Sequence, residues 1–599
     1  MTQPYFRYRP LRTPDSVRLL HLQPAQDASS TVHVRFSEVR LPAASQTLRS
    51  SPRYEALSYT WGDVRNRQSI TSDTGDLLVT RNLFEALIHL RHTEEIRTLW
   101  VDAVCINQDE VLERDAQVRL MGRIYSRADL VIVWLGPSAN SSDIVPPLVE
   151  RLVSLWDERD QDETRIITQD EIERHHIPPR DAPVWSAFIA LLRRPWTTRV
   201  WVIQEVALSQ RARVVCGHVE MDWDELAVAA TLMAQAQIFD TTRLAGTDGI
   251  PTISSAKIQC RDGEQFDLMF QISHTRSYQA TDPRDKVFAL LSIVDDEDRA
   301  AIEVDYSIDA TTLYVDVAWY IIQSTETLDI LEHAGFGKKL QNLPSWVPDW
   351  SLTLPENYMS LVDVCHSAYW LEVTKYGPVV TDVDERTCLC VDGMRIDVID
   401  EVSCALEGEA VAIENLSQEC RERRFAHVFD QWENLALTIN EHRYPEDVYG
   451  DGVTNAYWKT LIAGATAENE EVDLEYGRYF VDWYRKYRAG GKMDMSQVTT
   501  KDSSLTSEEG ATTYSGCVFD VGFGRRFGKT KDRYMGMFPR DTKRADLVII
   551  LFGSRFPVVL REVNGGWAFL GVCYVHGIWP NDFVEGPTKA QRTERFRLC

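Results

Sequence analysis

Positive charge is scarce in this 599-residue sequence, in which 64 Lys and Arg stand against 90 Asp and Glu and leave a net charge of −26. Proteins that bind nucleic acid cluster Lys and Arg against the phosphates, so this balance argues against a nucleic-acid partner. Long apolar runs are also missing: no stretch reaches the ~18 residues that a membrane helix needs, and the first twenty residues hold no apolar signal segment. We therefore expect a cytoplasmic protein with no membrane insertion.

Paired cysteine spacings are absent among the 11 Cys. Cys388 and Cys390 stand one residue too close for a CxxC pair, and an odd count without a signal segment is typical of reduced, intracellular thiols. His175 and His176 are neighbours whose side chains point apart on any regular element. We expect reduced cysteines and no metal site.

Familiar catalytic signatures are missing as well. The sequence contains neither a Gly-x-Ser-x-Gly elbow nor an HExxH motif. The stretch Gly522–Thr530 (GFGRRFGKT) leaves three residues between Gly524 and the Gly528-Lys529 pair, where a phosphate-binding P-loop needs four. We expect a tight turn there and no nucleotide site.

Short apolar runs alternate with helical patterns through the first third of the chain. Such alternation requires crossover connections, which predict a parallel sheet with helices on both faces. After two strands near the N-terminus (16–22 and 32–41), the expected elements are strands at 56–59, 99–106, 130–135 and 212–216, a hairpin at 69–80, and helices at 82–92, 113–127, 183–192 and 197–209.

The pattern changes beyond about residue 220. Helical stretches come first, and a polar segment at 493–507 is the best linker candidate. Residues 514–585 look β-rich, with strands at 517–521, 547–552, 558–561 and 567–575. We expect an N-terminal β segment (1–49), an α/β domain (50–220), a helical extension (221–345), a mixed α+β region (346–510) and a β-rich C-terminal domain (511–599).

Two acidic residues are candidates for a functional site. In a helix, Trp201 and Glu205 are i,i+4 neighbours, and burial beside an indole raises the pKa of a carboxyl. The alternative is a structural Glu205 paired with Arg199 or Arg194. Asp102 lies within a predicted buried strand and needs a partner, for which Arg114, Arg119 and Arg127 are candidates in a structural ion pair.

Three blocks of the sequence resemble the motif blocks of the fungal heterokaryon-incompatibility (HET) domain. They are Tyr54–Gly62 (YEALSYTWG), Leu99–Gln108 (LWVDAVCINQ) with Glu113, Arg114 and Gln117, and Arg194–Glu205 (RPWTTRVWVIQE). Weaker similarity extends through 282–287 (DPRDKV), 305–307 (DYS), 345–350 (SWVPDW), 557–561 and 574–577. The whole chain therefore resembles one member of this family.

The resemblance implies a role in fungal non-self recognition, a form of innate immunity that ends in programmed cell death. It also implies a distant similarity to Toll/interleukin-receptor (TIR) domains, some of which hydrolyse NAD. The expected architecture is then a TIR-like, flavodoxin-like parallel sheet.

TIR enzymes carry their catalytic Glu on the third helix in a Trp-x-x-x-Glu context, which Trp201 and Glu205 match. The resemblance implies Glu205 as the catalytic residue and NAD as a substrate, with no prosthetic group. Ligands of such sheets bind beyond the carboxyl ends of the strands. We therefore expect NAD contacts from Ser58, Tyr59, Trp61, Gly62, Asp102, Arg199 and Trp201.

A non-enzymatic reading stands beside this hypothesis. TIR-like folds also act as signalling modules, and a fold alone does not decide function. In that case the chain triggers cell death through protein–protein contact, either by self-association or by binding an incompatibility partner protein.

Overall fold

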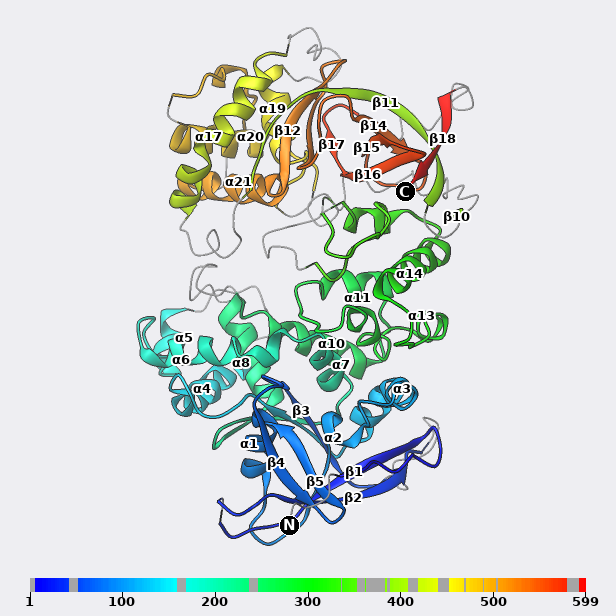
Figure 1. The fold of residues 1–599 in the computed structure, drawn as a ribbon. Coiled ribbons are helices and arrows are strands. Elements are labelled where there is room, and N and C mark those ends of the chain that lie inside the picture. The colour runs from blue at the N-terminus through cyan, green and yellow to red at the C-terminus, as the bar shows by residue number, and fades with distance from the viewer. Residues whose placement is uncertain are drawn as a thin grey trace. The chain divides into compact units, whose positions relative to one another are not determined.

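The computed structural model describes residues 6–27, 29–42, 52–158, 168–235, 246–335, 337–352, 361, 383–384, 388–407, 418–439, 452–467, 470–488, 490–501, 505–578 and 592–599. The chain divides into two compact units, Met1–Asp309 (unit 1) and Ala310–Cys599 (unit 2) (Figure 1). Each unit contains one large sheet system, and the two are described separately.

Unit 1 is built on a nine-stranded sheet with the order β5-β4-β2-β1-β6-β3-β7-β8-β9. The strands β6, β3, β7 and β8 are parallel and, counted along the chain, lie in the order 2-1-3-4. The strand bounds are β1 (Ser16–Leu22), β2 (His33–Arg40), β3 (Glu55–Tyr59), β4 (Arg67–Ser72), β5 (Gly75–Thr80), β6 (Arg97–Trp100), β7 (Leu130–Trp134), β8 (Ala212–Cys216) and β9 (Val219–Asp222).

The sheet is mixed, so the expectation of a wholly parallel sheet holds only for its centre. β1 pairs antiparallel with both β2 and β6, and β9 pairs antiparallel with β8. Connections of a few residues, as between β8 and β9, permit antiparallel pairing without a crossover helix. The β4–β5 hairpin joins β2 at the far edge of the sheet, where β4 and β2 are parallel.

Two expected elements of unit 1 differ from the structure, and two helices, at 146–157 and 169–174, were not predicted. The predicted strand 99–106 ends at Trp100, and Asp102 begins a helical turn. The helices are α1 (Arg81–Leu90), α2 (Asp102–Cys105), α3 (Val111–Arg127), α4 (Pro146–Asp157), α5 (Gln169–Arg174), α6 (Pro183–Leu192), α7 (Trp201–Ala207), α8 (Trp223–Gln235), α10 (Gly249–Asp262), α11 (Leu268–His274), α12 (Asp285–Phe288) and α13 (Asp296–Ala301).

The predicted helix 197–209 is broken by a tertiary contact. A 3-10 helix, Pro195–Thr198, comes first, and Arg199 is extended before α7 begins. Arg199 forms a β-bridge with Gln279, whose carbonyl accepts a hydrogen bond from the Val200 amide at 3.0 Å. These bonds occupy backbone groups that a continuous helix would have used internally.

Unit 2 combines helices with a second large sheet system (Figure 1). The predicted strand 517–521 is wrong, because these residues belong to α21. The elements are α14 (Ala310–Thr325), β10 (Val383–Asp384), β11 (Cys388–Ala405), α17 (Gln418–Ala436), α19 (Val453–Leu461), α20 (Leu474–Tyr487), α21 (Ser507–Gly522), β12 (Arg525–Thr530), β13 (Met535–Pro539), β14 (Leu547–Leu551), β15 (Val558–Val563), β16 (Gly566–Val572), β17 (Tyr574–Val575) and β18 (Thr593–Leu598).

The strand β11 is 18 residues long and pairs in turn with β18, β14 and β12. Because β14 pairs with β15, β15 with β16, and β16 with β18, the ring β11-β14-β15-β16-β18 returns to β11 and forms a closed barrel. The glycine-rich stretch 522–530 becomes the end of α21, a turn at Gly524 and the strand β12.

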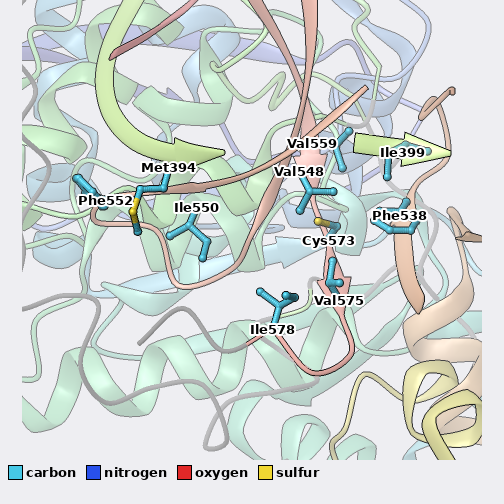
Figure 2. Close-up of a cluster of buried hydrophobic side chains, with 10 residues drawn as sticks. All are labelled: Met394, Ile399, Phe538, Val548, Ile550, Phe552, Val559, Cys573, Val575 and Ile578. Carbon is cyan, nitrogen blue, oxygen red and sulfur yellow. The ribbon is translucent and has the colours of Figure 1, made fainter. Parts of the chain in front are cut away.

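Apolar side chains from the barrel strands and from β13 and β17 form one cluster (Figure 2). β14 contributes Val548 and Ile550, which are two residues apart and therefore share one face of the strand. Beside them lie Met394 and Ile399 of β11 and Phe538 of β13. The cluster is the core that holds the β region of unit 2 together.

Cys388 and Cys599 form a disulfide, which contradicts the expectation of reduced cysteines for these two residues. The neighbouring pair Leu389 and Leu598 stands in register between β11 and β18, which brings the two Cys Cα atoms to 4.4 Å. Cys105, Cys216, Cys260, Cys390, Cys404 and Cys573 carry free thiols.

Two glycines of α21 allow a matched test of helix packing. A Cβ added at Gly516 meets no atom within 4 Å, whereas one at Gly510 lies 2.6 Å from Tyr479 Cδ1. We expect Gly516→Ala to raise the free energy of unfolding of unit 2 by about 0.5–1 kcal/mol, because alanine has the higher helix propensity. Gly510→Ala should lower it. Urea denaturation of the full chain measures both, and destabilisation by Gly516→Ala would contradict the packing described for this helix.

Candidate functional site

The candidate site lies where the end of β3 contacts α7. Ser58 is the fourth residue of β3 and Glu205 the fifth of α7. The Ser58 hydroxyl donates a hydrogen bond to Glu205 Oε2 and accepts one from Trp196 Nε1 at 2.8 Å. β3 lies between β6 and β7, at the change of direction in the parallel strand order, which is where ligands bind in doubly wound sheets.

Burial dominates the electrostatics of Glu205, whose side chain belongs to a residue only 4 % exposed. Burial raises the pKa of this carboxyl to about 7, and the nearby Asp102 adds to the rise. The Arg199 guanidinium and hydrogen bonds from Ser58 and Tyr125 act in the opposite direction. The carboxyl therefore changes its protonation state near neutral pH.

Asp102 occupies the first residue of α2 and has partners other than those expected. Trp61 Nε1 donates to Asp102 Oδ2 at 2.8 Å, and the Ala103 amide donates to Oδ1 at 2.7 Å. Burial raises the pKa of Asp102, while the charge of Arg199 lowers it. The predicted pairing with Arg114, Arg119 or Arg127 is wrong, because the turn at 101–105 directs the carboxyl toward the loop after β3.

Arg199 joins the two carboxyls electrostatically. Its guanidinium donates to the carbonyl oxygen of Tyr59, and its charge acts on both Asp102 and Glu205. The Tyr59 hydroxyl is buried next to Asp102 without a hydrogen bond of normal geometry. The expected pairing of Glu205 with Arg194 is not seen, since Arg194 donates to the Ala139 carbonyl and to Cys216 Sγ.

Gly62 shapes the loop that carries Trp61. Its φ of +73° lies in the left-handed region, which a side chain disfavours. The same loop is anchored by Asn82, which donates to the Thr60 carbonyl at 2.6 Å and accepts from Trp134 Nε1 at 3.0 Å. These contacts hold the Trp61 indole where it reaches Asp102.

Trp201 is bound to a different group of residues. Asp285 accepts hydrogen bonds from the Trp201 side chain and from the Tyr306 hydroxyl, the latter at 2.6 Å. Burial raises the pKa of Asp285 to about 6. Tyr306 also lies under the guanidinium of Arg114, 4.2 Å from its ring centre. Trp201 thus ties α7 to the segment 282–307.

Several site residues were not predicted. Three of them, Trp196, Asp285 and Tyr306, lie in quoted motif blocks. The fourth, Tyr125, lies in the helix predicted at 113–127. Gln204 also lies in a quoted motif block and was not predicted. It is buried, and neither its amide nitrogen nor its amide oxygen has a hydrogen-bond partner among the described residues. Buried polar groups without partners are rare, and they concentrate in places that bind water or ligand.

No group of three or more His, Cys, Asp or Glu side chains in the described part of the chain is placed to hold a metal ion. The His175 ring instead lies 3.0 Å from the Glu158 carboxylate. Across the same residues, no helix has the length and apolar character required to cross a bilayer.

Two stretches of the chain match known family models. Residues 54–205 match the model of the heterokaryon incompatibility protein (HET) family, and residues 465–596 match that of the Het-6 beta-barrel domain. Part of unit 1 is thus similar to the HET family, and part of unit 2 is similar to the Het-6 barrel domain. The long strand β11 lies outside the second match, so the closed barrel includes residues 388–405 as well.

The similarity also extends over nearly the whole chain. Heterokaryon incompatibility protein 6, OR allele, from Neurospora crassa is 24 % identical over an alignment that covers 95 % of this chain and 94 % of that protein. No solved structure matches the chain.

Proposed function

We propose that this chain acts in heterokaryon incompatibility, where it contributes to fungal non-self recognition and triggers cell death. The observation that carries this proposal is the combination of similarity to the HET family and to the Het-6 barrel domain in a chain similar along almost its full length to one incompatibility protein. The contact between Ser58 and Glu205 joins the first motif block of the HET domain to the third.

We further propose hydrolysis of NAD as the effector chemistry, with Glu205 as the catalytic residue. The C1′–N bond to nicotinamide breaks and its electron pair leaves with nicotinamide. Water then adds to C1′ and releases a proton. The ionised Glu205 carboxylate stabilises the positive charge that develops on the ribose, as carboxylates do in glycoside hydrolysis. The position of Glu205 beside the end of β3 supports this role, as does the strand order 2-1-3-4, which places a ligand site at the end of β3 in doubly wound sheets.

The described conformation is closed, because Glu205 is 4 % exposed and bonded to Ser58. Catalysis therefore requires an opening step in which the loop with Trp61 moves away from Asp102. Once open, only the ionised acid is active. With a pKa of about 7, its ionised fraction rises about tenfold between pH 6 and pH 8, and the rate should follow.

The same burial favours a second candidate function, assembly without chemistry. A carboxyl that is enclosed and hydrogen-bonded to Ser58 also serves as a structural link between β3 and α7. On this reading, cell death follows from self-association or from contact with an incompatibility partner protein, and NAD is not consumed.

The substitution Glu205→Gln separates these functions, with Glu303→Gln as a matched control on the exposed surface of unit 1. Purified full-length protein is incubated with NAD and nicotinamide is measured, while viability is scored in a fungal host. We expect release and cell death from the wild type and the control, and release at least about 100-fold slower from Glu205→Gln. Equal killing by all three proteins without release would contradict the NAD hypothesis and support assembly. Survival of hosts that express the wild type would contradict the incompatibility proposal.

A further inference from the structure

The barrel of unit 2 depends on β18 for its closure. β18 pairs with β11 from Leu389 opposite Leu598 to Met394 opposite Thr593. It meets β16 through the single pair Trp567 and Leu598. Without β18, β11 and β16 would each present an unpaired edge, which is a ready template for another strand.

A covalent bond fastens this closing strand. Cys388 is the first residue of β11, Cys599 directly follows β18, and their disulfide links positions 211 residues apart. A cross-link that closes so long a loop removes much of the entropy that favours detachment of the strand. Since β18 is joined to the barrel by few bonds on its β16 side, this link contributes strongly to keeping it in place.

Noncovalent contacts also hold β18, so that loss of the disulfide need not unfold the barrel. The Cys599 amide donates to the Trp567 carbonyl at 2.9 Å, and Arg595 pairs with Asp392 at 2.8 Å. Phe596 and Leu598 are buried. We therefore expect β18 to stay paired with the barrel whether or not the disulfide is present. Without the disulfide, the strand detaches more easily.

The two sulfurs differ in access. Cys388 is 5 % exposed, whereas Cys599 is partly exposed, so an external thiolate reaches Cys599 first. Cys390 lies two residues from Cys388, on the same face of β11, with a free thiol opposite Arg597. It offers a matched control that leaves the disulfide intact.

We propose that the Cys388–Cys599 disulfide is a redox-sensitive site that controls opening of the barrel, with a small or protein dithiol as the co-reactant. The thiolate of the dithiol attacks Cys599 Sγ, the S–S bond breaks, and Cys388 leaves as a thiolate that takes up a proton. The second thiol of the reductant then attacks the mixed disulfide and releases Cys599. Two protein thiols form, and the dithiol becomes a disulfide.

Hydrogen exchange and peptide mapping of the full chain test this proposal without any use of NAD. Protein purified without reductant should yield a cross-linked Cys388–Cys599 peptide on a non-reducing map. Dithiothreitol under native conditions should remove this peptide and raise amide exchange in β18 at least about tenfold, in the wild type and in Cys390→Ser. Cys388→Ser and Cys599→Ser should show the fast exchange before dithiothreitol is added and no further change afterwards.

Three results would overturn the proposal. They are alkylation of both cysteines in protein prepared without reductant, exchange in β18 that dithiothreitol leaves unchanged, and a Cys390→Ser variant that behaves like Cys388→Ser. Because two different cysteines are replaced, a folding defect in one variant leaves the other to decide the outcome. The dithiothreitol result on the wild type needs neither variant.

Discussion

Glu205→Gln should stabilise unit 1 at pH 8 and leave its stability nearly unchanged at pH 4. The folded pKa of Glu205 is about 7 against an ordinary value of 4.5, mainly because of burial. As pH rises above 4.5 the unfolded chain loses this proton while the folded chain keeps it, so stability falls until pH 7 and then stays low. The full difference is about 3 kcal/mol. Glutamine resembles the neutral acid and its amide oxygen accepts from Ser58, so the variant avoids the loss.

Chemical denaturation of the full chain between pH 4 and pH 8 measures this effect, with exchange of the β3 amides as a local probe of unit 1. Glu303→Gln, which replaces an exposed acid, provides the control and should follow the wild-type curve. Parallel curves for the wild type and Glu205→Gln would show that the carboxyl ionises normally in the folded state. This measurement reports on burial alone and does not depend on catalysis.

Arg488→Met should lower the free energy of unfolding of unit 2 by about 3–5 kcal/mol, because it leaves a buried charge without its partner. The side chains of Arg488 and Glu433 are each 4 % exposed, and Arg488 Nη2 lies 3.2 Å from Glu433 Oε2. Glu433 also accepts hydrogen bonds from the Tyr484 hydroxyl and from the Met493 amide. The carboxylate thus holds the segment that follows α20 against α17.

Arg423→Met is the matched control, since the pair Arg423 and Glu419 on the same helix, α17, has side chains 76 % and 65 % exposed. Its expected loss is below about 0.5 kcal/mol. Adding Glu433→Gln to Arg488→Met should recover part of the stability, because the unpaired charge is then removed. Urea denaturation measures all three. Equal effects of Arg488→Met and Arg423→Met would show that the pair is solvated.

Glu433 also shows why the predicted linker at 493–507 does not separate domains. Its polar composition is typical of a loop, yet the Met493 amide is bound by Glu433, which is 60 residues away in the sequence. The polar composition of a segment shows only that it lacks an apolar pattern. It cannot predict whether a carboxylate far away in the sequence binds the segment's backbone.

Local pattern by itself determined much of unit 1. The helical pattern at 113–127 correctly predicted α3, and the apolar run at 130–135 correctly predicted β7. The alternation of strands and helices predicted the parallel centre of the sheet. These features depend on side-chain spacing within a single element, which neighbouring residues specify.

Only the tertiary structure decided how the site is connected. The bridge to Gln279 ends the helix before Arg199, and the bond between Ser58 and Glu205 spans 147 positions of the chain. The barrel likewise closes through Cys388 and Cys599, which are 211 positions apart. Partners that meet across such separations are chosen by the packing of whole elements, so no short stretch of residues encodes them.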